Sequence, residues 1–207
     1  ESNCYPVVCV HGIPASSFLY RKNMPLLAAE GLRGIALDLP GFGLAERPAG
    51  FDHGIRGHGA WMETALDTLG IERFHLVVHD YGGPVGFELC ARAGQRVRSL
   101  TVLDTVVDVE HFRRPPLLEM AFRAGAAHAM MRSLPGAVFH RAMLRLGVLD
   151  PAALTRAESD AWLELMRDGD HGRSVLHVAR HLETTAALSA RLNAAVRALD
   201  VPQQLIW

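Results

Sequence analysis

The chain has little lysine and no concentration of charge of one sign. Its 207 residues include a single lysine, Lys22, and the formal net charge is −1 at pH 7. Acidic and basic residues are interspersed, and no basic run is longer than Arg113–Arg114. Because nucleic-acid-binding domains carry a basic patch or stripe, this distribution argues against a nucleic-acid partner. The arginines are scattered along the sequence, so no phosphate-binding cradle is expected from them.

Cysteines and long apolar stretches are also scarce. Cys4, Cys9 and Cys90 are odd in number and lack CxxC or metal-ligand spacing, which disfavours a disulfide framework and predicts a reducing compartment, the cytoplasm. No apolar stretch approaches membrane-spanning length and no signal peptide is visible, so no membrane partner is expected. The histidines lack a ligand spacing such as H-E-x-x-H, so no metal or other cofactor is predicted.

Short apolar runs alternate with helical patterns along much of the chain. This alternation predicts an α/β fold with a mostly parallel sheet, because strands rich in Val, Leu and Ile suit a sheet that helices cover on both faces. The predicted strands are 6–12, 32–39, 73–80, 97–104 and 201–207. Helices are predicted over 58–70 and 84–94. Residues 1–105 and 200–207 form the predicted core.

Residues 106–199 break the alternation, since they hold several helical patterns and no convincing strand. They predict an inserted helical lid that ends in a helix returning to the core. Within the lid, Thr155 and Glu158 form a T-x-x-E capping box that opens a helix to about Arg167.

The stretch HLVVHDYGGPVG, residues 75–86, holds the most informative residue, Asp80. A strand that runs straight into a helix needs a sharp turn, and the residue at the tip projects above the edge of the sheet. Gly82 and Gly83 lack a Cβ, so they allow the strand and the helix to approach closely. Asp80 is therefore a candidate nucleophile that is already ionised at neutral pH.

Four segments together resemble a known family. HGIPASSFLYR (11–21), DLPGFGLAERP (38–48), VVHDYGG (77–83) and VLD (102–104) are similar to the α/β-hydrolase fold, in its aspartate-nucleophile branch of haloalkane dehalogenases, haloacetate dehalogenases and epoxide hydrolases. The match covers nearly the whole chain outside the lid. The family's first two strands and its histidine base after a further strand are missing, so the resemblance implies an internal fragment of a longer hydrolase that lacks the catalytic histidine.

The resemblance implies a role for each matched residue. Asp80 would attack a saturated carbon and become a covalent ester, which a histidine-activated water would then hydrolyse. The backbone N–H groups of Ile13 and Tyr81 would hold the oxyanion of that second step. Asp104 occupies a position where the branch keeps the acid that orients its histidine, although a strand-end aspartate that caps the start of the lid is the alternative. His11 and Asp38 are expected to be structural.

The sequence also makes predictions about the geometry of the pocket. We expect a pocket between sheet and lid, lined by Ile13, Phe42, Tyr81 and unranked lid residues. Trp162 could add an indole N–H, but its place on the apolar face of the capped helix favours a core role. The Ile13–Pro14 peptide bond is a candidate for the cis isomer, since X-Pro bonds in tight loops accept it at modest cost.

The substrate class stays open among several alternatives. Where dehalogenases carry Asn and Trp to hold the departing halide, this chain has Ile13 and Tyr81, and the phenol O–H of Tyr81 can donate one hydrogen bond. No arginine pair lies beside the nucleophile to clamp a haloacid. Arg113 and Arg114 at the start of the lid are possible substitutes, but a solvated pair is the favoured expectation. Epoxide hydrolases use lid tyrosines to protonate the opening oxygen, and residues 106–199 contain none. Cleavage of carbon–halogen bonds in a small apolar molecule therefore ranks first, an epoxide hydrolase second, and a non-catalytic ligand-binding protein is the alternative from another class.

Overall fold

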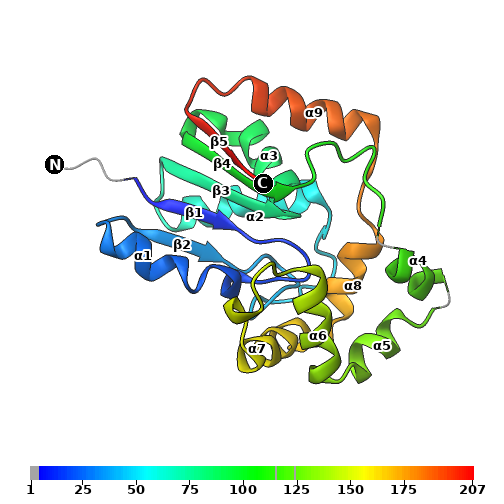
Figure 1. Ribbon diagram of the computed structural model, residues 1–207. Helices are drawn as coiled ribbons and strands as arrows, with labels where there is room; N and C mark the ends of the chain where they lie inside the picture. Colours follow the sequence, from blue (N-terminus) through cyan, green and yellow to red (C-terminus); the bar gives the residue numbers. More distant parts are fainter. Residues whose placement is uncertain (1–4, 115, 124) are drawn as a thin grey trace.

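The computed structural model describes residues 5–114, 116–123 and 125–207, and Cys4 lies outside them. Five parallel strands form one sheet in the order β2-β1-β3-β4-β5 (Figure 1). The strands are β1 (Val7–Val10), β2 (Gly34–Leu37), β3 (Phe74–Asp80), β4 (Val97–Thr105) and β5 (Gln203–Ile206). The predicted parallel α/β sheet is confirmed, with strand ends that differ by a few residues.

Different helices cover the two faces of the sheet. On one face α3 (Gly82–Ala93) packs between α2 (Ile55–Thr68) and α9 (Ala186–Arg197). Successive strand residues point to opposite faces, so Val8 of β1 joins the core on this side, whereas Cys9 faces the other side.

The other face carries a smaller cover beside β1 and β2. The 3-10 helix η1 (Ser17–Tyr20) and α1 (Asn23–Ala29) lie there, and Tyr20 is buried with its hydroxyl donating to the Val10 carbonyl at 2.8 Å. Cys9 and Cys90 are both buried free thiols. The prediction of strands covered on both faces holds for β1 but is wrong for β5, whose four residues are all exposed.

Between β4 and β5, all regular secondary structure of the described residues is helical. We call residues 106–185 the lid segment; α9 follows it and returns to the core. Its helices lie beyond the carboxyl ends of β1 and β2, at the lower right of Figure 1. They are α4 (Pro116–Arg123), α5 (Ala127–Ser133), α6 (Gly136–Leu146), α7 (Arg156–Arg167) and α8 (Arg173–Arg180), with the 3-10 helix η3 (Pro151–Ala153).

The capping signal in the sequence located the start of α7 correctly, whereas the start of α2 was missed by three residues. The predicted capping box is present at the start of α7, where the Thr155 hydroxyl accepts from the Glu158 N–H at 3.2 Å and the Glu158 carboxylate accepts from the Thr155 N–H at 2.8 Å. α2 begins three residues before its predicted start, after Gly54. None of the helices in the described ranges is long and apolar enough to cross a membrane.

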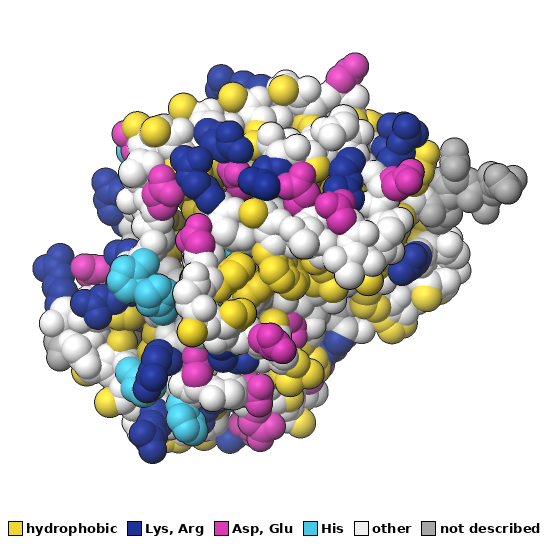
Figure 2. Space-filling view, turned by 180° about the vertical axis from the view of Figure 1, so that it is seen from behind, with side chains coloured by type: hydrophobic (Ala, Val, Ile, Leu, Met, Phe, Trp, Pro, Cys, Tyr) yellow, Lys and Arg dark blue, Asp and Glu magenta, His cyan; other side chains and the backbone are white. Residues whose placement is uncertain are grey.

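The surface mixes charges of both signs. On the face shown in Figure 2, basic and acidic side chains alternate over the upper part of the molecule, and hydrophobic side chains gather near its middle. This agrees with the interspersed charges of the sequence, which predict no extended field of one sign.

Candidate active site

Asp80 occupies the sharp turn between β3 and α3. Its φ of 51° lies in the left-handed region, which a non-glycine residue adopts at a cost in backbone strain. A Cβ at position 82 would run into the Val10 carbonyl, and one at position 83 would run into the Thr105 side chain. The Thr105 hydroxyl donates to the Asp80 carbonyl oxygen. The two glycines therefore permit the close approach that the sequence predicts for them.

The loop after β1 meets the Asp80 carboxylate directly. The Ile13 N–H donates to Asp80 Oδ1 at 2.6 Å, and the Ile13–Pro14 bond is cis, as predicted. A Cβ at Gly12 would collide with the Asp80 side chain, so this position requires glycine. The amide proposed for an oxyanion hole thus already contacts the carboxylate.

The environment of Asp80 acts on its ionisation in two directions. Burial raises the pKa of the Asp80 carboxyl, and the nearby Asp104 charge adds to this; the backbone N–H groups of Tyr81 and Ile13 oppose it. The net direction of the pKa is upward. These N–H donors, together with the neighbouring His79, favour the ionised form, which is the form able to attack carbon.

Asp80 opens into a cavity of about 440 Å³ between the core and the lid segment. The core contributes Ile13, Pro14, Ile55, Asp80, Tyr81 and Pro84 to its lining. The lid segment contributes Val106, Val109, Phe112, Arg114, Met131, Leu134, Phe139, Met166, Val175, Leu176, Ala179, Leu182, Glu183 and Thr184. The lining is overwhelmingly apolar, and none of the described residues that form it is a histidine.

Tyr81 lines this cavity with its ring, but its hydroxyl is already bonded. His58 Nε2 lies 3.0 Å from the Pro40 carbonyl, which can only accept, so Nε2 carries a proton. Burial lowers the pKa of His58 to about 4, so the imidazole is neutral and its Nδ1 accepts from the Tyr81 hydroxyl at 2.9 Å. The Tyr81 hydroxyl, considered above as a donor to the leaving group, therefore already donates its proton to His58.

The structure places Phe42 and Trp162 outside the cavity lining, which corrects their predicted contact with substrate. Phe42 is fully buried, and its ring packs edge-on against His11 with centroids 5.3 Å apart. The Trp162 indole N–H donates to the Pro14 carbonyl at 3.1 Å, and the ring packs in the cluster formed by α6 and α7. Trp162 therefore anchors the loop that carries Ile13. This agrees with the core role expected from its place on the apolar face of α7.

Asp104 is the second-last residue of β4 and is exposed. It has a φ of 28° and does not line the cavity. No hydrogen bond or ion pair joins its carboxylate to another residue within the described ranges, although its charge acts on Asp80. The alternative role as a cap for the start of the lid thus has no bond to support it.

His11 and Asp38 are structural, as expected. His11 is fully buried, its Nε2 accepts from the Leu39 N–H at 3.1 Å, and its Nδ1–H donates to the Gly12 carbonyl at 3.0 Å. Burial lowers the pKa of His11, in keeping with this neutral tautomer. Asp38 joins two loops, because its carboxylate accepts from the N–H groups of Ser17 at 2.6 Å and Leu44 at 2.8 Å.

Arg114 lines the cavity, and each of its three guanidinium nitrogens already makes a bond. Its Nε donates to the Ala179 carbonyl at 2.7 Å, its Nη2 donates to the Arg180 carbonyl at 2.5 Å, and Nη1 pairs with Glu119 at 3.3 Å. The expectation of a solvated arginine is wrong here, because α8 ends with unpaired carbonyl groups and the guanidinium satisfies them. Arg113 is exposed, as expected.

Sequence reasoning did not identify the lid residues that line the cavity. A signal existed in α8, where Val175, Val178 and Ala179 follow the i, i+3, i+4 spacing of a buried stripe, and Val175 and Ala179 reach the cavity. The spacing identifies the buried face of a helix. It does not say which cavity that face meets.

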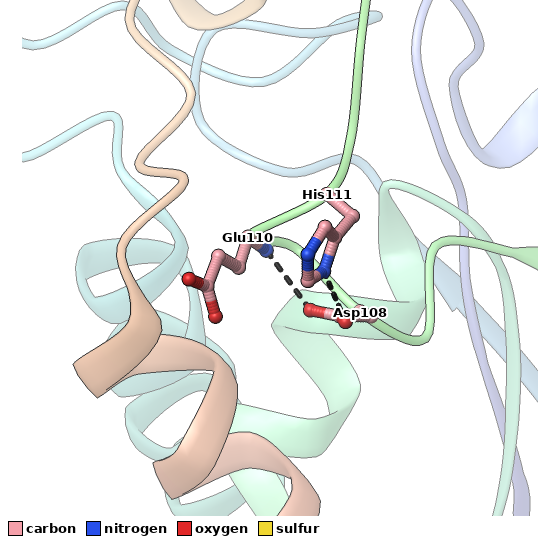
Figure 3. A group of neighbouring side chains, drawn as sticks. All are labelled: Asp108, Glu110 and His111. Atoms are coloured by element: carbon pink, nitrogen blue, oxygen red, sulfur yellow. Dashed lines mark hydrogen bonds and ion pairs between the residues drawn. The ribbon is translucent and has the colours of Figure 1, made fainter.

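Figure 3 shows a compact group of polar side chains in the loop after β4, formed by Asp108, Glu110 and His111. Their ligand atoms lie within 4.8 Å of one another, yet all three residues are exposed. Asp108 accepts from the Ser189 hydroxyl at 2.7 Å, the Glu110 N–H at 3.1 Å and His111 Nδ1 at 2.7 Å. These bonds tie the loop to α9 and account for the group without a metal ion.

The comparisons with known proteins agree with this geometry. A haloalkane dehalogenase of Psychrobacter cryohalolentis is 39% identical over 103 residues, which are 49% of this chain and 34% of the relative. Haloalkane dehalogenase 2 of Mycobacterium tuberculosis is 36% identical over 100 residues, covering 48% of this chain and 35% of the relative. The matched region thus spans about a third of the length of these curated relatives.

Solved structures match over more of the fold. A haloalkane dehalogenase from Bradyrhizobium elkani superposes with a TM-score of 0.75 at 26% identity, covering 99% of this chain and 73% of the other. An epoxide hydrolase superposes with a TM-score of 0.74 at 24% identity, covering 97% and 74%, and shares the fold. A family model for the alpha/beta hydrolase fold matches residues 5–176. The chain therefore belongs to the α/β hydrolase fold family.

Proposed function

We propose that this protein is a hydrolase of neutral, apolar alkyl halides in which Asp80 is the nucleophile. One observation carries the proposal: a buried carboxylate at a strained strand-to-helix turn accepts a backbone N–H at 2.6 Å and faces a cavity of about 440 Å³ with an apolar lining. The named relatives include haloalkane dehalogenases, which supports the halide as leaving group.

The first chemical step needs only groups in this site. An oxygen of the Asp80 carboxylate donates an electron pair to the substrate carbon, the carbon–halogen bond breaks, and halide leaves with that bond's electrons. The product is an alkyl ester of Asp80, and no proton is transferred. Oδ1, held by the Ile13 N–H, becomes the ester carbonyl oxygen if the other oxygen attacks. The same N–H is then in place for the oxyanion that hydrolysis would generate.

Ester hydrolysis is the step for which the site lacks a group. A water that attacks the ester carbonyl needs a general base, and no histidine among the described cavity-lining residues supplies one. We propose that Asp104, exposed and unbonded within the described ranges, is the acid that would orient such a base. The residues of this chain would then carry the alkylation step and not the turnover.

The charges around the cavity favour a neutral substrate. Arg114 is bonded to Ala179, Arg180 and Glu119, and Glu183 pairs with Arg56 at 3.6 Å. Arg114 is the arginine among the described lining residues, and its existing bonds, including the one to Glu119, disfavour haloacids as substrates. Epoxides are disfavoured because ring opening needs a proton donor and the Tyr81 hydroxyl is committed to His58. The buried free thiols of Cys9 and Cys90 suit the predicted cytoplasmic location.

Intact-mass analysis tests the proposal directly. The protein is incubated with a primary alkyl bromide, an alkyl carboxylic acid brominated at its far end, and an epoxide of similar size. The expected result is a single stoichiometric adduct from the bromide, mapped to Asp80 by peptide sequencing and absent in Asp80→Asn.

Other outcomes separate the alternatives. Saturable binding of the bromide with no adduct in either protein would favour the non-catalytic ligand-binding alternative. An Asp80 adduct formed faster from the epoxide would favour an epoxide hydrolase. Sustained multiple turnover would contradict the proposal that the residues of this chain carry only the alkylation step.

A further inference from the structure

Helix α8 has two faces of different character. Val175, Val178 and Ala179 are buried beneath it. The opposite face carries Arg173, His177 and Arg180 at the i, i+4, i+7 spacing of one stripe, and all three are exposed. The buried face is part of the site described above. The polar face has no part in it.

This polar face forms one wall of a second, smaller cavity. The cavity of about 200 Å³ lies where α5 contacts α8, and we call it the α5–α8 groove. Its lining consists of Phe122, Gly125, Ala127, His128, Arg173, Leu176, His177, Arg180 and His181. Five of these side chains can carry positive charge, and none is acidic. The main cavity, by contrast, includes the carboxylates of Asp80 and Glu183.

The two guanidinium groups of the groove have no partner. Within the described ranges, neither the Arg173 nor the Arg180 side chain makes a hydrogen bond or an ion pair, whereas Arg114, Arg167 and Arg47 on neighbouring elements all do. The acid nearest to Arg173 in sequence does not neutralise it. Asp170 accepts from the N–H groups of Arg173 and Ser174 and lies 3.6 Å from Arg47.

On the α5 side of the groove, a buried histidine nitrogen adds to the two arginines. His128 Nε2 is buried and has no hydrogen-bond partner in the described part of the chain. Leaving a buried polar nitrogen without a partner is energetically costly. An oxyanion that accepts from this nitrogen and from a guanidinium would remove that cost and the repulsion between the two arginines.

We propose that the α5–α8 groove binds a small oxyanion through Arg173, Arg180 and His128. The chemistry that these groups recognise is shared by phosphates and carboxylates: several negative oxygens that accept from planar guanidinium forks. A tetrahedral dianion can accept from both arginines and the imidazole together, so a phosphate is expected to bind more tightly than a carboxylate. The inference is independent of the reaction at Asp80.

Calorimetric titration with inorganic phosphate, and separately with acetate, at constant ionic strength tests this site. We expect saturable binding of phosphate that weakens about ten-fold or more in Arg173→Gln/Arg180→Gln, since hydrogen bonds to charged groups contribute about 1.5–3 kcal/mol each. Acetate should bind more weakly and lose its affinity in the same variant. Equal affinity of the two anions, with the same dependence on both arginines, would identify carboxylates as the ligand class of the site.

A matched control separates a built site from general attraction of anions. Arg141→Gln/Arg145→Gln removes the same charge from α6, where both arginines are exposed and unbonded within the described ranges. This control should leave phosphate affinity within about two-fold. Equal weakening in both double variants, or titration without saturation, would overturn the proposal. Circular dichroism confirms that each variant is folded.

A spectroscopic readout tests the role of His128 independently of affinity. In long-range ¹H–¹⁵N spectra, the His128 Nε2 resonance should shift as phosphate saturates the wild-type protein and should stay fixed in Arg173→Gln/Arg180→Gln. His128→Phe keeps a ring of similar size and removes the donor, so it should weaken phosphate binding several-fold. An unshifted His128 resonance together with unchanged affinity in His128→Phe would remove it from the site.

Discussion

The turn around Asp80 and the lid segment above it are held in different ways. At the turn, Gly12, Gly82 and Gly83 each sit where a Cβ would collide with a neighbouring group, and the Asp80 carboxylate accepts a backbone N–H. The cavity wall from the lid segment consists mainly of apolar side chains that touch without directional bonds. The difference teaches that the Asp80 carboxylate is positioned by the backbone, whereas the cavity is shaped by side-chain volume.

The largest effect is expected from a single methyl group at the turn. Gly12→Ala places a Cβ against the Asp80 side chain, so the carboxylate must move away from the Ile13 N–H. A displacement of this size should slow formation of the Asp80 adduct by about 100-fold, measured by intact mass against time. Gly94→Ala is the control, because its Cβ meets only the end of the Leu199 side chain. Equal rates in both variants would contradict the claim that the backbone positions the carboxylate.

The link between the two regions can be broken at Trp162. Trp162→Phe removes the N–H that donates to the Pro14 carbonyl and keeps most of the ring. The free energy of unfolding should fall by about 1 kcal/mol, and adduct formation should slow as well, because Pro14 adjoins Ile13. Urea denaturation and intact mass measure the two effects. Trp61→Phe changes a ring without a hydrogen bond; if it had the same effect on adduct formation, ring size and not the N–H would be responsible.

The lid segment can be weakened without touching the turn. Thr155→Ala removes the N-cap of α7 and should lower the free energy of unfolding by about 1 kcal/mol. Adduct formation by the folded protein should stay unchanged, because Thr155 does not line the cavity. Thr155→Ser keeps the capping hydroxyl and should restore stability. A slower adduct rate at full folding would show that the lid segment positions Asp80 after all.

The smallest effect concerns the electrostatics of the turn. Since burial and the Asp104 charge raise the pKa of Asp80, the rate of adduct formation should rise with pH through a midpoint above the ordinary aspartate value. Asp104→Asn removes a like charge, so the midpoint should move to lower pH by a fraction of a unit. The pH profile of the adduct rate measures this shift. A midpoint that moves upward would mean that Asp104 stabilises the ionised Asp80.

The site is more predictable at the turn than in its side-chain contacts. The place of Asp80 at the turn, the role of the paired glycines, the cis bond at Ile13–Pro14 and the structural roles of His11 and Asp38 all follow from short motifs. The lining role of Phe42 was misassigned, and the sequence did not reveal that the Tyr81 hydroxyl and the Trp162 indole N–H are bonded to other groups. Each depends on a partner far along the chain, such as His58 for Tyr81.

The sequence alone was enough to determine the parallel sheet, the helical segment after β4 and the acidic residue at the strand-to-helix turn, because periodicity, glycine positions and capping residues act over a few neighbouring positions. Only the tertiary structure decided which polar groups are left without partners. The arginines look scattered in the sequence, yet α8 and α5 bring Arg173, Arg180 and His128 to one groove. The packing of distant segments determines which groups become hydrogen-bond partners, and local sequence patterns do not encode that packing.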